Sequence, residues 1–301
     1  MEKDNQKIIV YVGGGAMSGV YGAGVLKGLR DLSLTNKIES IYAGSAGSFN
    51  AAYFLAGQVE LGQRIYWEDL QKSFIFRKNI PLGILDLFKN RFIKKVEKEK
   101  FHNAVNINHL CNVAKSVKKL NLKNIEENPI NLFIEVLNIE SGEVEYLNFR
   151  EFPKIDLLKA ATSVKPYFFE ETEINGKHYI DGTIKEPIGF SYLKNKYPDR
   201  KILIVINEPI KRGLRHYVEK ILEGSVATLY PYKIPLFKIF LQNENIKRAD
   251  IKKALNDPQI LLLYPNFKNR VLPKTTNPSV LKDSFYHGIE DSKNVLSFID
   301  R

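Results

Sequence analysis

The sequence predicts an α/β fold, a three-layer αβα arrangement with helices on both faces of one mostly parallel central sheet. Short apolar runs rich in β-branched residues alternate with longer stretches of helical period, and glycine turns separate the two. Of the 301 residues, 44% are apolar and 26% are charged, which indicates a globular chain rather than a disordered one.

Two strand–turn–helix units are expected in the N-terminal part of the chain. Residues 7–12 are a short, nearly continuous apolar run that ends in glycines, which is typical of a buried parallel strand. A helix is expected at residues 20–32, where apolar side chains recur at helical spacing. A second strand at 38–43 and a helix at 49–56 repeat this order around Ser45.

The same patterns predict the elements of the remaining chain. Further strands are expected at residues 130–137, 144–149, 177–180, 201–207 and 259–264. Further helices are expected near residues 157–164, 216–229, 236–255 and 280–299. We interpret residues 1–301 as one domain, with a core at 8–210, a helical cap insertion at about 72–128 and a C-terminal helical and strand extension at 211–301.

Charge and cysteine content restrict the partners and the compartment. The net charge of +11 favours an anionic partner, such as a phospholipid surface or nucleic acid, or else a solvated basic surface. The single cysteine, Cys111, excludes an intrachain disulfide and indicates a reducing compartment. No run approaches the roughly 20 apolar residues that span a bilayer, and residues 1–7 are polar. We therefore expect a cytoplasmic protein whose contact with a membrane is at most peripheral, at the inner face.

A candidate nucleophile, Ser45, lies in the turn between the second strand and its helix. The turn reads Ala-Gly-Ser-Ala-Gly over residues 43–47, and a nucleophile elbow requires such small neighbours. We expect Gly44, Ala46 and Gly47 to support it, and the N-terminus of the next helix to stabilise developing negative charge. The alternative is a helix cap without chemistry, since serine and glycine are common there.

A glycine-rich loop over residues 13–16 follows the first strand and precedes the first helix. A dinucleotide site would require G-x-G-x-x-G, but Ser18 stands where the third glycine should be. A P-loop is excluded because no Gly-Lys-Ser/Thr follows. The remaining functional interpretation is an oxyanion hole formed by the N–H groups of Gly14, Gly15 and Ala16. The structural alternative is a tight turn.

A serine nucleophile needs a proton acceptor, and Asp181 is the candidate base. It ends the strand expected at 177–180 and precedes Gly182, which places a carboxylate at the carboxyl end of a strand, where α/β ligand crevices open. The alternatives are an Asp-Gly β-turn and a Ser-His-Asp triad. The histidines, none of which lies in a turn with a catalytic signature, are His102, His109, His178, His216 and His287.

Taken together, these stretches resemble the patatin-like phospholipase family, and the similarity extends from residue 8 to about residue 190. The family's G-G-G/A-x-R/K-G loop matches residues 14–19, its G-x-S-x-G elbow matches 43–47, and its D-G-G/A motif matches 181–183. Residues 160–166 are similar to the family's A-S-x-x-x-P segment. Segments similar to a bacterial branch of the family are Gly57-Gln58, Tyr264-Pro265 and Tyr286-His287-Gly288.

The resemblance implies a serine hydrolase that cleaves fatty acyl esters of phospholipids or lysophospholipids through a Ser45–Asp181 dyad and an acyl-serine intermediate. It implies no metal and no organic cofactor. Three residues depart from the family pattern, since Ala43 replaces a glycine, Ser18 a basic residue and Thr183 a small residue. Ser18 and Ala43 motivate an alternative, a non-catalytic lipid- or membrane-binding protein on a degraded patatin fold.

A segment at residues 74–92 combines apolar side chains with a basic cluster and suits docking on an anionic membrane. The alternative is a cap helix that packs on the core, with a solvated basic flank. The apolar residues are Phe74, Ile75, Phe76, Ile80, Leu82, Ile84, Leu85, Leu87, Phe88 and Phe92, and the basic ones are Arg91, Lys94, Lys95, Lys98 and Lys100.

Two other site classes are not expected. His102, His109 and Cys111 match no common zinc spacing, so we predict no metal site. Nucleic acid is the competing partner for a chain of this charge, but the aromatic residues do not interleave with the basic ones as they do in known binding modules. We therefore predict a lipid acyl ester, and no nucleic acid, as the partner.

Overall fold

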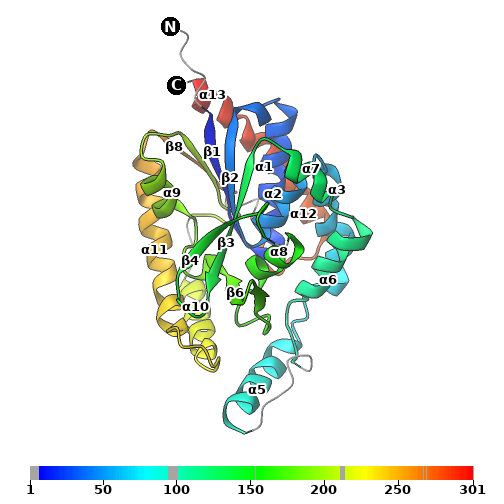
Figure 1. Cartoon of the computed structure of the whole chain (residues 1–301), viewed down its shortest axis with the longest axis vertical. Helices are drawn as coiled ribbons and strands as arrows, with labels where there is room; N and C mark the ends of the chain where they lie inside the picture. Colours follow the sequence, from blue (N-terminus) through cyan, green and yellow to red (C-terminus); the bar gives the residue numbers. More distant parts are fainter. Residues whose placement is uncertain are drawn as a thin grey trace.

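The computed structural model describes residues 7–93, 101–152, 154–210, 214–266, 268 and 270–300. The described strands form one eight-stranded sheet in the order β5-β6-β3-β2-β1-β7-β8, and β4 pairs with β3 as well (Figure 1). The strands are β1 (Ile8–Val12), β2 (Ile38–Gly44), β3 (Asn131–Asn138), β4 (Val144–Asn148), β5 (Thr172–Ile174), β6 (Lys177–Asp181), β7 (Ile202–Val205) and β8 (Ile260–Leu263).

Helices separate and follow these strands. The α-helices are α1 (Val20–Asp31), α2 (Ala46–Leu55), α3 (Val59–Arg64), α4 (Leu70–Ser73), α5 (Asn79–Phe92), α6 (Ile107–Asn112), α7 (Leu122–Glu127), α8 (Lys154–Thr162), α9 (Phe190–Lys196), α10 (Leu214–Ala227), α11 (Leu236–Asn256), α12 (Pro278–Ser292) and α13 (Asn294–Asp300). The short 3-10 and π segments are η1 (Ala16–Gly19), η2 (Thr35–Lys37), η3 (Ile65–Asp69), η5 (Val113–Val117) and η6 (Gly182–Ile184).

The central part of the sheet is parallel and one edge is antiparallel. β1 pairs in parallel with β2 and β7, β2 with β3, and β7 with β8. On the other side, β4 and β6 pair antiparallel with β3, and β5 with β6. Every residue of β1 and β7 is buried, as parallel strands are when helices cover both faces. The predicted α/β class with a mostly parallel central sheet is confirmed.

The two faces of the sheet carry separate helical layers. Val10 and Val12 of β1 pack in the core that α1, α2 and α12 cover, whereas Ile9 and Tyr11 pack in the core that α9 and α11 cover. The alternation follows from the period of two along a strand. The two groups of helices lie on opposite sides of the sheet in Figure 1.

The prediction of one helix at residues 280–299 is wrong, because two helices, α12 and α13, occupy this stretch. At the end of α12 the Ser292 hydroxyl donates to the carbonyl of Ile289 at 2.6 Å. The N–H of Lys293 reaches back only three residues, to the carbonyl of Glu290 at 3.2 Å. Both bonds tighten the last turn, so the regular helical ladder stops there.

The region predicted as a helical cap, residues 72–128, contains α5, α6, η5 and α7. In Figure 1, α5 extends below the body of the molecule. Of the apolar residues in the candidate docking segment, Phe74 and Leu87 are buried against the protein, as in the alternative of a cap helix that packs on the core. Lys94, Lys95, Lys98 and Lys100 lie outside the described residues. The division of the chain into core, cap and extension stays a prediction.

Candidate active site

The predicted nucleophile and base meet because β2 and β6 share one edge of β3. Gly44, at the end of β2, pairs with Glu135, and Asp181, at the end of β6, pairs with the next residue, Val136. β4 occupies the opposite edge of β3 over this stretch. The two strands therefore run toward each other along the same edge, and Ser45, which follows Gly44, lies where β6 ends.

Ser45 occupies a strained turn between β2 and α2. Its backbone has φ 50° and ψ −129°, a conformation that residues with a Cβ rarely adopt. This is expected at a nucleophile elbow, where a sharp strand-to-helix turn presents the serine hydroxyl. The turn leaves no room for a side chain at Gly47, because a Cβ there would lie 2.1 Å from the carbonyl oxygen of Val12. Ala43 is accommodated because it is a strand residue of β2, paired with Val12 of β1, and it needs no left-handed backbone.

Asp181 is buried, and only one of its two carboxylate oxygens is fully engaged. Oδ1 accepts hydrogen bonds from the N–H of Thr183 at 3.0 Å and from its hydroxyl at 2.7 Å. Oδ2 accepts no well-formed hydrogen bond from the described residues, although the Ser45 hydroxyl is close enough to stabilise the carboxylate. Hydrogen bonds between catalytic groups are often long before substrate binds.

Burial raises the pKa of Asp181 from 3.8 to about 6. Hydrogen bonds from Thr183 and Ser45 and the positive charge of Lys220 limit this rise. A carboxylate with this pKa is ionised at neutral pH and is a better proton acceptor than an ordinary aspartate. The pKa of a carboxyl group rises in this way when burial removes the water that would stabilise its ionised form.

The glycine loop lies directly against the serine. A Cβ on Gly14 would lie 2.5 Å from Cβ of Ser45 and 3.1 Å from its Oγ, so this approach requires glycine. Gly15 has φ 140° and likewise favours glycine. Within the described chain the N–H groups of residues 14–16 donate no hydrogen bond, whereas that of Gly13 does. The loop thus holds three unused donors beside the hydroxyl.

Two side chains fix the direction of these donors. Asn207 donates from Nδ2 to the carbonyls of Gly13 at 2.7 Å and Gly14 at 2.9 Å. The Ser18 hydroxyl donates to the carbonyl of Gly15 at 2.7 Å. In a trans peptide the C=O and the following N–H point in opposite directions. Holding the carbonyls of residues 13–15 therefore turns the N–H groups of residues 14–16 away from Asn207 and Ser18.

Neither of these loop-holding residues was predicted to act in this way. Ser18 was predicted as a departure from the family pattern, but it is buried and its hydroxyl stabilises the loop. Asn207, just past β7, was not identified at all. Its Oδ1 also accepts from the N–H of Gly22 at 2.8 Å, so it ties the loop to α1. The available signal was a lone amide at the carboxyl end of a buried apolar strand.

A buried carboxyl group, Glu135, lies beneath the site. Its Oε2 accepts a hydrogen bond from the Tyr11 hydroxyl at 2.7 Å. A Cβ on Gly44 would lie 2.8 Å from Oε2, and a Cβ on Gly182 would lie 2.8 Å from Cγ of Glu135. Glu135 therefore packs against the residue before the nucleophile and the residue after the base. Burial, together with the negative charge of Glu186, raises the pKa of Glu135 well above its usual value.

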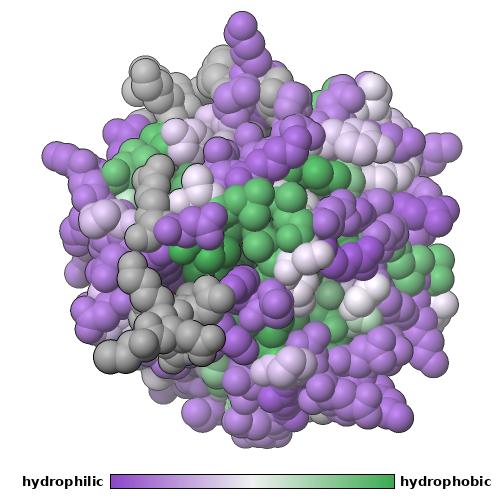
Figure 2. Space-filling view, turned by 90° about the horizontal axis from the view of Figure 1, so that it is seen from above, coloured by the Kyte–Doolittle hydropathy of each residue, from purple (hydrophilic) through white to green (hydrophobic). Residues whose placement is uncertain are grey.

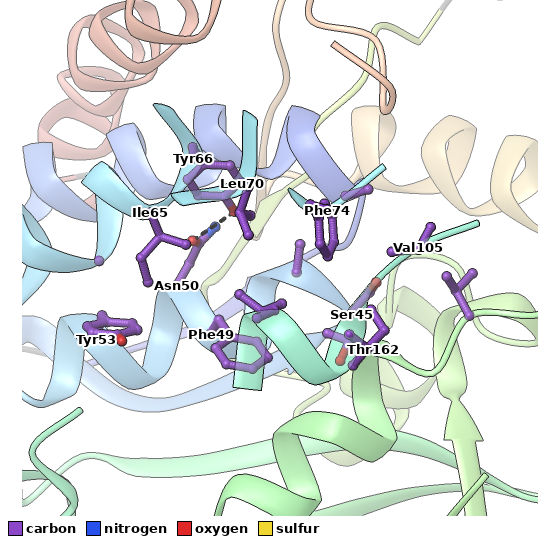
Figure 3. Close-up of a pocket in the computed structure, with 16 residues that line it drawn as sticks. Ser45, Phe49, Asn50, Tyr53, Ile65, Tyr66, Leu70, Phe74, Val105 and Thr162 are labelled. Atoms are coloured by element: carbon purple, nitrogen blue, oxygen red, sulfur yellow. Dashed lines mark hydrogen bonds between the residues drawn. The ribbon is translucent and has the colours of Figure 1, made fainter. Parts of the chain in front are cut away.

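A narrow apolar pocket of about 40 Å³ begins at Ser45. Ser45, Thr162 and Val105 line it at one end, and Tyr53 and Tyr66 line it at the other (Figure 3). Ala16 and Ala46, predicted to belong to the oxyanion loop and the elbow, also line it. The pocket therefore starts at the hydroxyl and continues between α2 and the residues of the cap region.

Apart from Ser45, the polar side chains that line this pocket are already paired with the protein. The Tyr66 hydroxyl donates to Oδ1 of Asn50 at 3.0 Å, and Nδ2 of Asn50 donates to the carbonyl of Gly19 at 2.8 Å. The Tyr53 hydroxyl donates to the carbonyl of Lys118 at 2.5 Å. Because these groups are engaged elsewhere, the pocket presents mainly carbon atoms to an occupant, which suits a hydrocarbon chain.

Three of the histidines make contacts elsewhere. His102 bonds to Asp86, His109 to the carbonyl of Asp69, and His178 to Glu140. These contacts offer no support for the triad alternative. In the part of the chain that the structure describes, no group of three or more His, Cys, Asp or Glu residues is placed to hold a metal ion. Among the same residues, no helix combines the length and the apolar character needed to cross a membrane.

Comparison with known proteins relates the chain to one family and finds similar solved structures. The family model described as patatin-like phospholipase matches residues 10–194, more than half of the chain. Among solved structures, the chain is similar to VipD from Legionella pneumophila, with 13% identity and a TM-score of 0.48. That alignment covers 97% of this chain and 67% of VipD. No curated protein matches the chain.

Proposed function

The chain belongs to the patatin-like phospholipase family, and on this premise we propose that it is a serine acyl hydrolase with a Ser45–Asp181 dyad. Family membership by itself implies a lipid acyl hydrolase. The observation that carries the finer proposal is the meeting of Ser45 with a buried carboxylate that has one unused oxygen, beside three unused N–H donors.

The proposed reaction proceeds through an acyl-serine intermediate. Asp181 accepts the Ser45 proton on Oδ2 as Oγ attacks the ester carbonyl carbon. The carbonyl oxygen becomes an oxyanion, which the N–H groups of residues 14–16 stabilise. The proton then passes to the departing alkoxide, and the ester bond breaks. A water molecule attacks the acyl-serine with Asp181 again as base, which releases the fatty acid and restores the hydroxyl.

The pocket supports a fatty acyl group as the part of the substrate that is bound. It is mainly apolar and is lined by Ser45, so it suits the part of an acyl chain next to an ester carbon held beside Ser45. The substrate class that we propose is the acyl ester of a phospholipid or lysophospholipid.

The alternative, a non-catalytic lipid-binding protein, was motivated by Ser18 and Ala43. Ala43 fits as a strand residue, and Ser18 donates a hydrogen bond that stabilises the glycine loop. Thr183, the third departure, hydrogen-bonds to Asp181. Because all three residues fit the proposed mechanism, they support the enzyme over the binder.

A fluorophosphonate probe tests the proposal. We expect it to modify one residue of the full chain, Ser45, which mass spectrometry of the digested adduct identifies. Ser45→Ala should lose both the adduct and the hydrolysis of a soluble p-nitrophenyl ester, with an unchanged circular dichroism spectrum. An adduct on another serine, or hydrolysis that survives Ser45→Ala, would refute the assignment. Vesicle binding by a wild-type chain that neither reacts nor hydrolyses would establish the binder instead.

A further inference from the structure

Helix α5 forms the end of an arm whose base lines the pocket. The chain leaves the body through Phe74 and returns through Val105, both pocket-lining residues. Ile75 and Val105 form an antiparallel bridge, the N–H of Phe76 donates to the carbonyl of Ala104 at 2.8 Å, and the N–H of Asn106 donates to that of Phe74 at 2.8 Å. Any surface on this arm is therefore joined directly to one wall of the pocket.

The inner face of α5 packs on the protein. A Cβ on Gly83 would lie 2.5 Å from the ring of Phe169, so the helix and this ring are in close contact. Oδ2 of Asp86 accepts hydrogen bonds from the backbone N–H of His102 at 2.9 Å and from its ring at 2.8 Å. Leu87 belongs to the same buried cluster as Phe169. These contacts fix which face of α5 is turned outward.

The outer face of α5 is an exposed apolar stripe. Ile84, Phe88 and Phe92 follow one another at intervals of four residues, and Leu85 lies beside them. Phe88 is 47% exposed and Phe92 is 64% exposed, and their rings contact each other in a tilted arrangement with 4.9 Å between centroids. The inner face already holds the helix on the protein, so these rings contribute apolar surface that the described chain does not cover.

Cations flank this stripe on both sides. With about 100° between successive residues, Arg91 lies along one border and Lys89 along the other, and both are exposed. Arg77 and Lys78, at the start of the arm, are exposed as well. The one acidic residue of α5, Asp86, is buried on the inner face. An apolar stripe with cationic borders is the arrangement by which a helix lies in the interface of an anionic bilayer.

Exposed apolar side chains also occur elsewhere on the molecule. Figure 2 shows a group of hydrophobic residues near the middle of the otherwise largely hydrophilic face seen from above. Such exposure alone does not indicate a partner. The arm differs because its cationic borders match an anionic surface and its base lines the pocket that begins at the nucleophile.

We propose that the outer face of α5, formed by Ile84, Leu85, Phe88 and Phe92 between Lys89 and Arg91, docks on an anionic lipid bilayer and brings the pocket to that surface. The inference rests on the proposed lipid hydrolase function. When the arm is docked, the residues that line one wall of the pocket lie next to the membrane surface, where a lipid acyl chain leaves the bilayer.

The binding experiment uses the full chain with Ser45→Ala, so that vesicles are not degraded. Flotation with phosphatidylcholine vesicles, with and without phosphatidylglycerol, measures the bound fraction. We expect binding that requires phosphatidylglycerol and weakens with added salt. Phe88→Ser with Phe92→Ser should reduce the partition coefficient at least about tenfold. Lys89→Glu with Arg91→Glu should reduce binding to anionic vesicles by a similar factor.

A matched control replaces two exposed apolar residues on helices outside the arm. Leu255 of α11 and Leu296 of α13 are 54% and 41% exposed, and Leu255→Ser with Leu296→Ser should leave vesicle binding unchanged. In the otherwise active chain, the phenylalanine pair should lower the ratio of vesicle phospholipid turnover to soluble ester turnover, whereas the control pair should not.

Three results would overturn the inference. One is equal vesicle binding by the phenylalanine pair and the control pair. Another is binding that does not depend on the anionic lipid. The third is an oligomer of the parent chain that the phenylalanine pair dissociates, with vesicle binding unchanged, since the stripe would then be a protein interface. Because binding is measured in the inactive variant, it is independent of whether the proposed hydrolase activity is found.

Discussion

Thr183 donates two hydrogen bonds to the same oxygen of Asp181, one from its backbone N–H at 3.0 Å and one from its hydroxyl at 2.7 Å. This holds the carboxylate by Oδ1 and leaves Oδ2 as the oxygen that can take the proton of Ser45. Both bonds favour the ionised carboxylate, so Thr183 lowers the pKa that burial raises. The residue that departs from the family motif thus orients the carboxylate of Asp181 and lowers its pKa.

Replacing Thr183 by valine removes the hydroxyl bond, keeps the backbone bond and preserves the shape of the side chain. The pKa of Asp181 should rise, because one hydrogen bond to its ionised form is lost. A base works only when deprotonated, so the acid limb of the pH profile of kcat/KM should shift to higher pH. At pH 6.5 we expect a loss of about three- to tenfold, with recovery near pH 9. Soluble ester hydrolysis across pH measures this.

The conservative control is Thr183→Ser, which keeps the hydroxyl and should keep the wild-type pH profile. A uniform loss of activity by Thr183→Val at all pH values would mean that the methyl and hydroxyl groups only pack the site. That outcome would contradict a role for Thr183 in adjusting the pKa of the base.

Asp181→Asn should abolish most activity and also stabilise the folded chain at neutral pH. Loss of the general base should lower kcat/KM by about 100- to 10,000-fold. The folded pKa of about 6 lies above the usual 3.8, so the wild-type fold loses stability as pH rises between these values. Above pH 6 this costs about 3 kcal/mol, because one pKa unit corresponds to about 1.4 kcal/mol.

Thermal melts of the two chains at pH 4 and pH 8 check this sign. We expect Asp181→Asn to melt a few degrees higher at pH 8, and most of the difference to disappear at pH 4, where the wild-type carboxyl is protonated in the folded state and lies near its usual pKa of 3.8 in the unfolded state. Equal melting temperatures at pH 8 would show that burial of the ionised Asp181 carboxylate does not destabilise the fold.

Local patterns predicted most of the sheet and both catalytic candidates. The apolar runs that became β1, β7 and β8 are continuous and end in turn residues, so burial on both faces was evident from composition. Ser45 and Asp181 were identified because each ends such a run beside glycine. Their contact depends on the register of β3, which pairs with both strands, and no pattern within either strand contains that register.

The supporting residues could not be predicted because their partners are distant in the chain. Asn207 acts on carbonyls that lie 193 and 194 positions earlier, and Glu135 accepts a hydrogen bond from Tyr11, 124 positions away. Neither has a spacing rule, since polar residues at the ends of strands serve many purposes. The break between α12 and α13 was missed for a different reason, because their apolar spacing continues across Lys293.

Asn207→Ala should reduce catalysis through the oxyanion donors without disturbing the nucleophile. Removal of one donor costs about 2.7–4 kcal/mol in other enzymes, and Asn207 directs two. We expect kcat/KM for a soluble ester to fall about 100-fold, with affinity for a tetrahedral boronic acid inhibitor falling in parallel. Ser18→Ala, which frees one carbonyl, should have a smaller effect.

An isosteric control separates the effect of Asn207 on the direction of the N–H donors from its effect on packing. Asn207→Asp keeps the acceptor that Gly22 uses but cannot donate to the carbonyls of Gly13 and Gly14. It should lose activity at least as strongly as alanine does. Weaker esterase activity without weaker boronic acid binding would place the effect of Asn207 outside the oxyanion loop.

Glu135 should act in its neutral form, as a support beneath the backbone of the dyad. Its pKa is raised well above the usual value, which favours the protonated form, and glutamine reproduces the charge and shape of that form. Glu135→Gln should therefore keep activity within about threefold and match or exceed the wild-type melting temperature at pH 8.

Glu135→Ala leaves the Tyr11 hydroxyl unpaired and opens a cavity under Gly44 and Gly182, which should cost about 2–4 kcal/mol of stability. Because the cavity loosens the strand ends that carry Ser45 and Asp181, kcat should fall more than KM changes. Equal damage by glutamine and alanine would show that the site needs an ionised carboxylate here, which would contradict the neutral support.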